Sequence, residues 1–253
     1  MQRPNLPLTD ELDGRHPGET IVIVGCARHV KDMDLRPLER FTTIGCNRLL
    51  LHPYFRPNYL MVADRRPYHK EMEAGRYKQW SDRITMMFST SMYDPIIKCH
   101  GAPIETPPTD FKWLPWRVRG SSSAMNWSTL GESVNSFASI AGPMLQAAVI
   151  MGAKRVAMVG IGIVPGPVKH LYDEREAWTG AGSPPTTLRC FERAKTELDK
   201  MGIPVHVCSP EDNLTESVRR LQKAYGHCTY EDFLRQHGDE AVRADQPAEG
   251  GTR

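Results

Sequence analysis

The sequence predicts an α/β fold, a Rossmann-like, mostly parallel sheet flanked by helices. Between residues 20 and 89, short apolar runs alternate with stretches of helical period, which is typical of βαβ units. The runs break at a glycine or a polar residue, as where Ile21–Val24 meets Gly25, and a similar block follows at Val156–Val159 and Gly160. In open α/β sheets, ligands bind at the carboxyl ends of the strands. Functional residues are therefore expected at these breaks.

We expect one Rossmann-like domain over residues 19–237, after a flexible lead-in at 1–18 and before a disordered tail at 238–253. Apolar runs place the strands at 20–24, 41–45, 59–63, 83–89, 155–159 and 205–208. Amphipathic periods place the helices at 31–40, 67–80, 133–151, 186–201, 215–225 and 230–237. Gly152 is expected to follow directly on the end of the helix at 133–151.

Residues 91–128 interrupt this alternation with five prolines and three tryptophans. Because structureless loops of this length are uncommon in compact domains, we expect an insertion that acts as a lid or as an acceptor-side subdomain. Packing of the insertion is the expected role of its tryptophans, Trp113, Trp116 and Trp127.

Composition narrows the class of protein and its partners. A formal net charge of +2 over 253 residues gives no strong signal for nucleic-acid binding. No apolar run approaches the roughly 20 residues that span a bilayer, and the N-terminus lacks a signal-peptide core. We therefore predict a cytoplasmic protein with no transmembrane segment, whose six cysteines are reduced and hold no zinc. Helices such as 215–225 could pair in a homo-oligomer.

Two nucleotide-binding classes are disfavoured. The glycines from Gly160 to Gly166 have the wrong spacing for a dinucleotide fingerprint, and their prolines suit a loop better than a helix start. The sequence contains no P-loop pattern GxxxxGK[ST].

Polar residues after the predicted strands are the candidates for chemistry. Asp64, followed by Arg65 and Arg66, could bind a ribose hydroxyl or Mg²⁺, or could lie in a surface loop. Asn47 could bond a nucleobase or ribose, or could cap a turn. His170, with Tyr172 two residues on, is suited to proton transfer near neutral pH, although a loop histidine is usually solvated.

Taken in order, these blocks resemble a family that groups the bacterial, Campylobacter-type sialyltransferases with the DUF115 proteins, which include the 6-hydroxymethylpterin diphosphokinases. The matching blocks lie between residue 20 and about residue 215: Gly25 to Val30, Cys46-Asn47-Arg48, Pro57 to Asp64, Ala141-Gly142-Pro143, Met151 to Ile161, His170-Leu171-Tyr172, and Val207 to Leu214. The chain departs from the family pattern at three places. Cys26-Ala27-Arg28-His29 replaces Gly-Pro-Ser in the first loop, Gly162 replaces an aspartate, and Ile140-Ala141 replaces a Thr or Ser.

The resemblance implies a glycosyltransferase that uses a nucleotide-sugar donor of CMP type and an acceptor that the sequence does not identify. On this basis, we expect Gly25, Asn47, Asp64 and Gly142 to surround the nucleotide and Arg28 and Tyr172 to meet its phosphate, with Arg28 replacing charge that backbone amides carry in the family. His170 would be the catalytic base, and no metal or other cofactor would be needed. Two alternatives stay open: an Mg²⁺-dependent diphosphokinase with Asp64 as metal ligand, and a non-catalytic nucleotide- or sugar-binding module.

Overall fold

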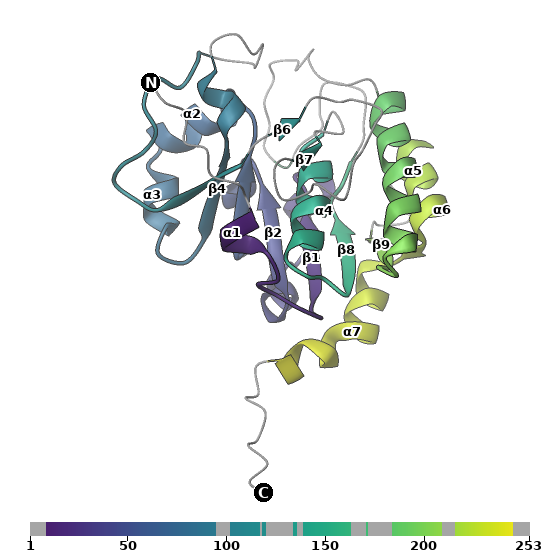
Figure 1. Ribbon diagram of the computed structural model, residues 1–253. Coiled ribbons are helices and arrows are strands. Elements are labelled where there is room, and N and C mark those ends of the chain that lie inside the picture. Colours follow the sequence, from purple (N-terminus) through teal and green to yellow (C-terminus); the bar gives the residue numbers. More distant parts are fainter. Residues whose placement is uncertain are drawn as a thin grey trace, which may run out of the picture.

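The computed structural model describes residues 9–94, 102–116, 118–119, 134–135, 139–162, 171, 184–208 and 216–244. In this part of the chain, eight strands form one parallel sheet in the order β10-β9-β8-β1-β2-β3-β4-β5 (Figure 1). Their bounds are β1 Thr20–Val24, β2 Thr42–Cys46, β3 Tyr59–Val62, β4 Thr85–Ser89, β5 Trp113–Trp116, β8 Arg155–Val159, β9 Val205–Cys208 and β10 His227–Cys228. A separate parallel pair joins β6 (Val118–Arg119) and β7 (Val134–Asn135). The predicted α/β class is confirmed.

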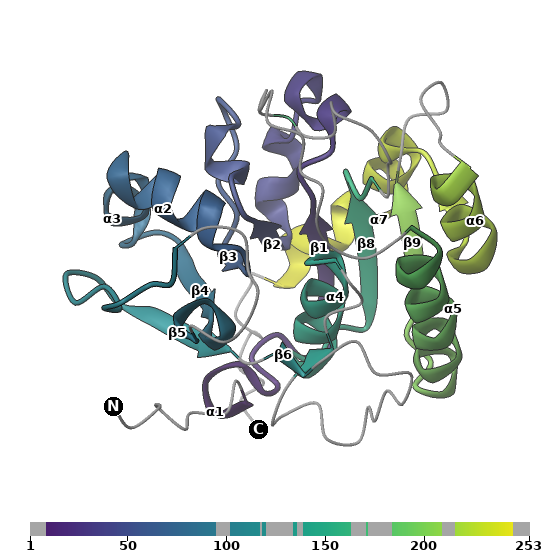
Figure 2. The same ribbon diagram turned by 90° about the horizontal axis from the view of Figure 1, so that it is seen from above.

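Helices lie on both faces of the sheet. The helix α4 contacts β1 and β2, and the view from above shows α2 and α3 on the opposite side (Figure 2). The α-helices are α1 Thr9–Leu12, α2 Arg65–Glu73, α3 Arg76–Trp80, α4 Ala141–Ile150, α5 Pro184–Lys200, α6 Glu216–Tyr225 and α7 Tyr230–Ala244. Short 3-10 helices are η1 Arg28–Asp32, η2 Arg36–Arg40, η3 Leu49–Leu51 and η4 Thr90–Tyr93.

Strands β1 and β3 consist almost entirely of apolar residues because both of their faces are covered. Every residue of β1 and of β3 is buried. Parallel strands enclosed in this way show continuous apolar runs rather than an alternation of apolar and polar residues. This is why the bounds of β1, β8 and β9 agree with the runs in the sequence.

The segment before β1 closes the carboxyl end of α4. The amides of Gly14, His16 and Gly18 donate to the carbonyls of Ile150, Met151 and Gly152 at 2.8–2.9 Å. The last carbonyls of a helix have no partner within the helix, so they need donors from outside it. The segment is thereby fixed to the domain from Gly14 onward. Gly152 follows the helix with φ +89°, as predicted.

Several helix predictions need correction. The helix expected at 67–80 is divided into α2 and α3, because Gly75 between them has φ +68°. The stretch 31–40 is not one helix: residues 31–32 end the 3-10 helix η1, residues 33–35 lie between, and residues 36–40 form η2, which has Pro37 in its first turn. The helix expected from residue 133 begins only at Ala141. Residues 238–244, expected in a disordered tail, continue α7.

The expected insertion is in part a component of the main sheet. Trp113–Trp116 forms the edge strand β5 beside β4, where Pro115 is tolerated because an edge strand has unpaired positions. The indole of Trp116 is buried and donates to the carbonyl of Met87 at 3.1 Å. A lid role for the rest of residues 91–128 stays a prediction, and Trp127 lies outside the described residues.

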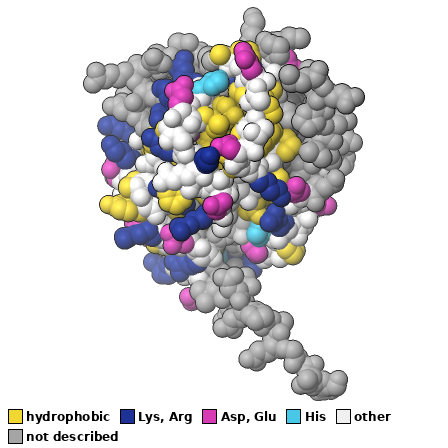
Figure 3. All heavy atoms as spheres, turned by 90° about the vertical axis from the view of Figure 1, so that its left-hand side faces the viewer, with side chains coloured by type: hydrophobic (Ala, Val, Ile, Leu, Met, Phe, Trp, Pro, Cys, Tyr) yellow, Lys and Arg dark blue, Asp and Glu magenta, His cyan; other side chains and the backbone are white. Residues whose placement is uncertain are grey.

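The surface beside α2 and α3 carries charges of both signs. Figure 3 shows Lys and Arg side chains interspersed with Asp and Glu on this side of the molecule. Two exposed ion pairs there, Lys78–Asp110 and Lys112–Glu11, have N···O distances of 3.1 and 3.2 Å. Exposed pairs of this kind contribute little to stability. In the described part of the chain, no helix has the length and apolar character to cross a bilayer.

Candidate functional site

The order of the strands reverses beside β1. From β1 the chain proceeds through β2, β3 and β4 to β5 on one side of the sheet, and it returns to β8 on the other side of β1. The amide of Gly25 donates to the carbonyl of Val159 at 2.8 Å, and the amide of Ala27 donates to that of Gly160 at 3.1 Å. Ligands bind at such a reversal in open α/β sheets. The candidate site is therefore the carboxyl edge around β1 and β8.

Gly25, a predicted site residue, is where the loops after β1 and β8 make their closest contact. A Cβ atom at Gly25 would lie 2.3 Å from the carbonyl oxygen of Gly160. Gly160 has φ +66°, and a Cβ atom there would lie 2.2 Å from a methyl group of Val30. Both positions require glycine, Gly25 because of space and Gly160 because of space and backbone conformation.

Leu171 connects the segment after β8 to the first loop. Its amide donates to the carbonyl of Cys26 at 2.8 Å, and its side chain is buried. In the sequence, Leu171 stands between His170 and Tyr172, the predicted base and phosphate ligand. His170 and Tyr172 themselves lie outside the described residues.

Asn47 has an unusual conformation and a buried oxygen that lacks a hydrogen-bond partner. Its φ is +47°, and no other non-glycine residue among those described has a positive φ. Its amide donates to the carbonyl of Met61 on β3 at 2.9 Å. Its side-chain Oδ1 is buried and accepts no hydrogen bond from the described residues. Strained backbone and unpaired buried polar atoms are concentrated at functional sites. Asn47 therefore carries the strongest structural signal at this edge.

Two thiols lie against each other beneath this edge. The sulfurs of Cys26 and Cys46 are 3.8 Å apart, and the Cys26 thiol also donates to the carbonyl of Cys46 at 3.1 Å. Burial raises the pKa of the Cys26 thiol well above its ordinary value, and the bond to Cys46 raises it further. A thiol held in its protonated form is a poor nucleophile. The arrangement therefore favours a packing role for Cys26.

Asp64 caps α2. Its side chain accepts a hydrogen bond from the amide of Arg66 at 3.0 Å, as is usual for an aspartate at the N-cap of a helix. Arg65 is buried, and its guanidinium Nε donates to the carbonyl of Met92 at 2.8 Å, so it fixes the turn after β4 instead of facing a ligand. Among the described residues, no group of three or more His, Cys, Asp or Glu is arranged to hold a metal ion. A ligand role for Asp64 stays a prediction.

The remaining predicted residues lie on different elements. Gly142 is buried in the first turn of α4, and its carbonyl accepts a hydrogen bond from the side chain of Gln146 at 2.9 Å. Arg28 is exposed at the start of η1. Gly25, Asn47 and Asp64 follow three neighbouring strands, β1, β2 and β3. Neighbouring strands are about 4.8 Å apart, so these three residues share one edge.

Sequence reasoning missed a buried ion-pair cluster behind this edge. Glu71 of α2 is completely buried, and its carboxylate lies 2.7 Å from the Nε of Arg48 and 3.2 Å from an Nη of Arg76. Burial raises the pKa of the nearby Tyr77 hydroxyl well above its ordinary value, and the charge of Glu71 raises it further. Buried carboxylates are rare unless they are paired, as Glu71 is here.

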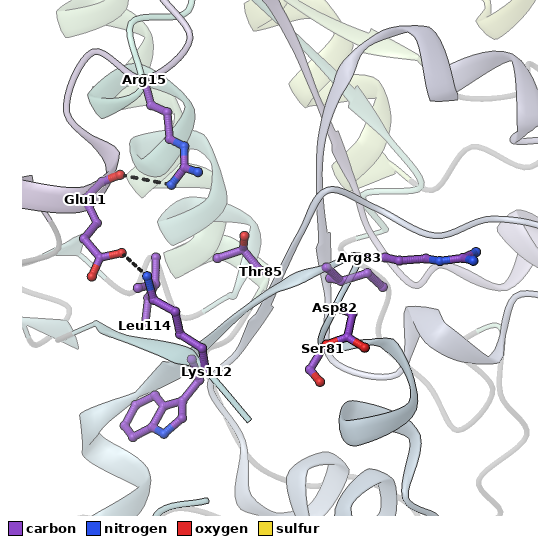
Figure 4. Close-up of a pocket in the computed structure, with 10 residues that line it drawn as sticks. Glu11, Arg15, Ser81, Asp82, Arg83, Thr85, Lys112 and Leu114 are labelled. Carbon is purple, nitrogen blue, oxygen red and sulfur yellow. Dashed lines mark hydrogen bonds and ion pairs between the residues drawn. The ribbon is translucent and has the colours of Figure 1, made fainter. Parts of the chain in front are cut away.

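A cavity of about 170 Å³ lies at the opposite, amino edge of the sheet (Figure 4). Its walls include Thr85 and Trp113, the first residues of β4 and β5, and Arg15, which donates to the carbonyl of Glu11. Ligand sites usually enclose about 300–1,000 Å³ and lie, in sheets of this kind, at the carboxyl edge. The cavity therefore does not belong to the candidate site.

Comparisons with known proteins gave a similar fold but no family. No protein-family model matches the chain, and no curated protein matches its sequence. A solved structure with a similar fold is that of the sialyltransferase CstII from Campylobacter jejuni in complex with a substrate analogue, cytidine 5′-monophosphate. The match covers 77% of this chain and 82% of the other, with 11% sequence identity and a TM-score of 0.45. At this level, the similarity concerns the arrangement of the chain and not a shared site or reaction.

Proposed function

We propose that this protein is a glycosyltransferase-like enzyme that transfers a sugar from a CMP-type nucleotide donor to the hydroxyl group of an acceptor. The observation that carries the proposal is the buried Oδ1 of Asn47 at the carboxyl edge of the sheet, with no donor among the described residues. A buried acceptor without a partner costs about 1–3 kcal/mol. A hydroxyl or amino group of a nucleoside would satisfy it.

The order of the sequence blocks supports the same class. Gly25, Asn47 and Asp64 follow three neighbouring strands, as the resemblance to the sialyltransferase and DUF115 family implies for a nucleotide site. In the proposal, Gly142 contributes to this site, while Arg28 and Tyr172 bind the phosphate, which Arg28 can do as an exposed cation. The hydrogen bond from Leu171 to Cys26 supports a site that combines the first loop with the His170-Leu171-Tyr172 block.

In the proposed reaction, His170 accepts the proton of the acceptor hydroxyl as its oxygen bonds to the sugar. The bond between the sugar and the nucleotide phosphate breaks at the same time, and the nucleotide leaves as an anion. General base catalysis contributes roughly 10²–10⁴-fold to the rate of such a step.

The test is the rate of nucleotide release from a CMP-linked sugar donor in the wild type and in His170→Ala. The variant is expected to lose about 10²–10⁴-fold in turnover while its affinity for CMP stays within about twofold. Equal turnover in the two proteins would exclude His170 as the base. Turnover that requires ATP and stops with EDTA would indicate the diphosphokinase instead, since the proposed transfer needs no metal.

A further inference from the structure

The loop that carries Asn47 is held in place from behind by a buried carboxylate. Arg48, the next residue, directs its guanidinium away from solvent to Glu71 on α2, with an Nε–Oε1 distance of 2.7 Å. The Arg48 side chain is 14% exposed and the Glu71 side chain is 0% exposed. The pair therefore joins the loop after β2 to the helix after β3 through a carboxylate that water does not reach.

The contacts of the neighbouring atoms make the position of Arg48 more rigid. The carbonyl of Arg48 accepts a hydrogen bond from the amide of Leu51 at 3.0 Å. The backbone amide of Arg48 also donates to the sulfur of Cys26. On the other side, the amide of Asn47 is bonded to Met61. Hydrogen bonds thus fix the backbone on both sides of Asn47, and its left-handed conformation connects the two sides. Such a conformation persists only where the surrounding structure determines it.

We propose that Glu71 and Arg48 are positioning residues for the nucleotide site, an inference that rests on the proposed function. Their ion pair keeps Asn47 at positive φ and so presents its carboxamide oxygen to the ligand. Neither residue touches the ligand in this account. Because Arg48 is already paired with Glu71, its charge serves to orient the loop and not to bind phosphate.

Arg76 provides a matched control. Its guanidinium pairs with the same carboxylate at 3.2 Å, but it begins α3 and is not part of the loop after β2. The variants Arg48→Gln and Arg76→Gln each leave Glu71 with one arginine, so both lose one half of the cluster. A purely structural role predicts that the two variants behave alike. A positioning role predicts that only Arg48→Gln disturbs Asn47.

The experiment titrates CMP into the full chain by calorimetry and records the melting temperature of each variant. We expect both variants to melt at a lower temperature than the wild type. The dissociation constant for CMP is expected to rise about tenfold or more in Arg48→Gln and to stay within about twofold of the wild type in Arg76→Gln. Arg48→Lys, which retains the charge but lacks the Nε that bonds Glu71, replaces Arg48→Gln if the latter does not fold. Equal affinities in the two variants, whether both weakened or both unchanged, would overturn the proposal.

A second readout separates this proposal from the proposed function. If the wild type does not bind CMP, the proposed function fails, and crystal structures of the unliganded Arg48 and Arg76 variants decide the positioning role. Departure of Asn47 from positive φ in the Arg48 variant alone would support that role. An Asn47 that keeps its φ in both variants would overturn it.

Discussion

Asn47 has two energetically unfavourable features that are not expected in a residue without a function. Its backbone has a positive φ, and its buried Oδ1 has no partner in the described part of the chain. Asparagine tolerates the left-handed region better than most residues, but glycine would adopt it without strain. An asparagine at this position is explained if its side-chain oxygen binds a ligand.

Replacement of Asn47 by glycine or alanine distinguishes the effect of its backbone conformation from the effect of its side-chain carboxamide. Asn47→Gly is expected to be at least as stable as the wild type, because it relieves the strain and removes the unpaired acceptor. Asn47→Ala is expected to lose about 1 kcal/mol relative to Asn47→Gly, since a Cβ atom is disfavoured at positive φ. Urea unfolding measures both.

The affinity for CMP is expected to depend on the side-chain carboxamide of Asn47 and not on the stability of the variant. Both variants are expected to bind CMP about tenfold more weakly than the wild type. Wild-type affinity in Asn47→Gly would show that the amide oxygen does not contact the nucleotide.

At this scale, the sequence reveals residues that end strands but not those that support them. Asn47 and Asp64 stand out because each is a polar residue directly after an apolar run. Glu71 and Arg48 do not, because α2 contains charged residues on several sides and its sequence does not show which one faces the sheet. Only the packing of α2 reveals that Glu71 is buried.

At the scale of elements, α7 packs against the amino end of β8 and β9 through a cluster of basic side chains. The rings of His206 on β9 and His237 on α7 are 5.9 Å apart, and an Nη of Arg155 lies 3.3 Å from the Nδ1 of His237. Burial lowers the pKa of His206, and the charges of Arg155 and His237 lower it further. The folded protein therefore favours neutral His206.

This contact predicts that stability falls in mild acid. Because the pKa of His206 is lower in the folded than in the unfolded state, the unfolded chain binds more protons as pH drops through this range. The contribution is complete above a pH of about 6.5, the ordinary pKa of histidine, and is lost below it. Burial also lowers the pKa of His52, which acts in the same direction.

The measurement is the urea midpoint between pH 7.5 and 5. The wild type is expected to lose stability over this range, and His206→Gln to lose less of it, while the exposed His227→Gln serves as the control. A pH dependence in His206→Gln as steep as that of the wild type would rule out this role of His206.

The predictability of the elements follows from their burial. Strands β1, β8 and β9 were predictable because parallel strands covered on both faces are continuous apolar runs. Strand β5 was not, because Trp113–Trp116 contains a proline and lies among prolines and polar residues, where only its pairing with β4 makes it a strand. The break between α2 and α3 depends on the φ of Gly75, which a helical period does not reveal.

At the scale of the whole molecule, the order of the strands determines where the site can lie. The reversal between β1 and β8 brings residues 25–27 against residues 159–160, which are more than a hundred positions apart in the sequence. The sequence indicates strand ends but not which of them become neighbours. The combination of these loops into one candidate site therefore required the topology.

The central claim is that this edge binds a CMP-type nucleotide without metal. A thermal-shift measurement with CMP, CDP, UDP, GDP, ADP and ATP, each with and without Mg²⁺, tests it most directly. A ligand at about 100 times its dissociation constant adds about 2.7 kcal/mol of stability, which such a measurement detects. We predict that CMP and CDP stabilise the protein equally with and without Mg²⁺. Stabilisation by ATP with Mg²⁺ alone, or by none of the nucleotides, would contradict the claim.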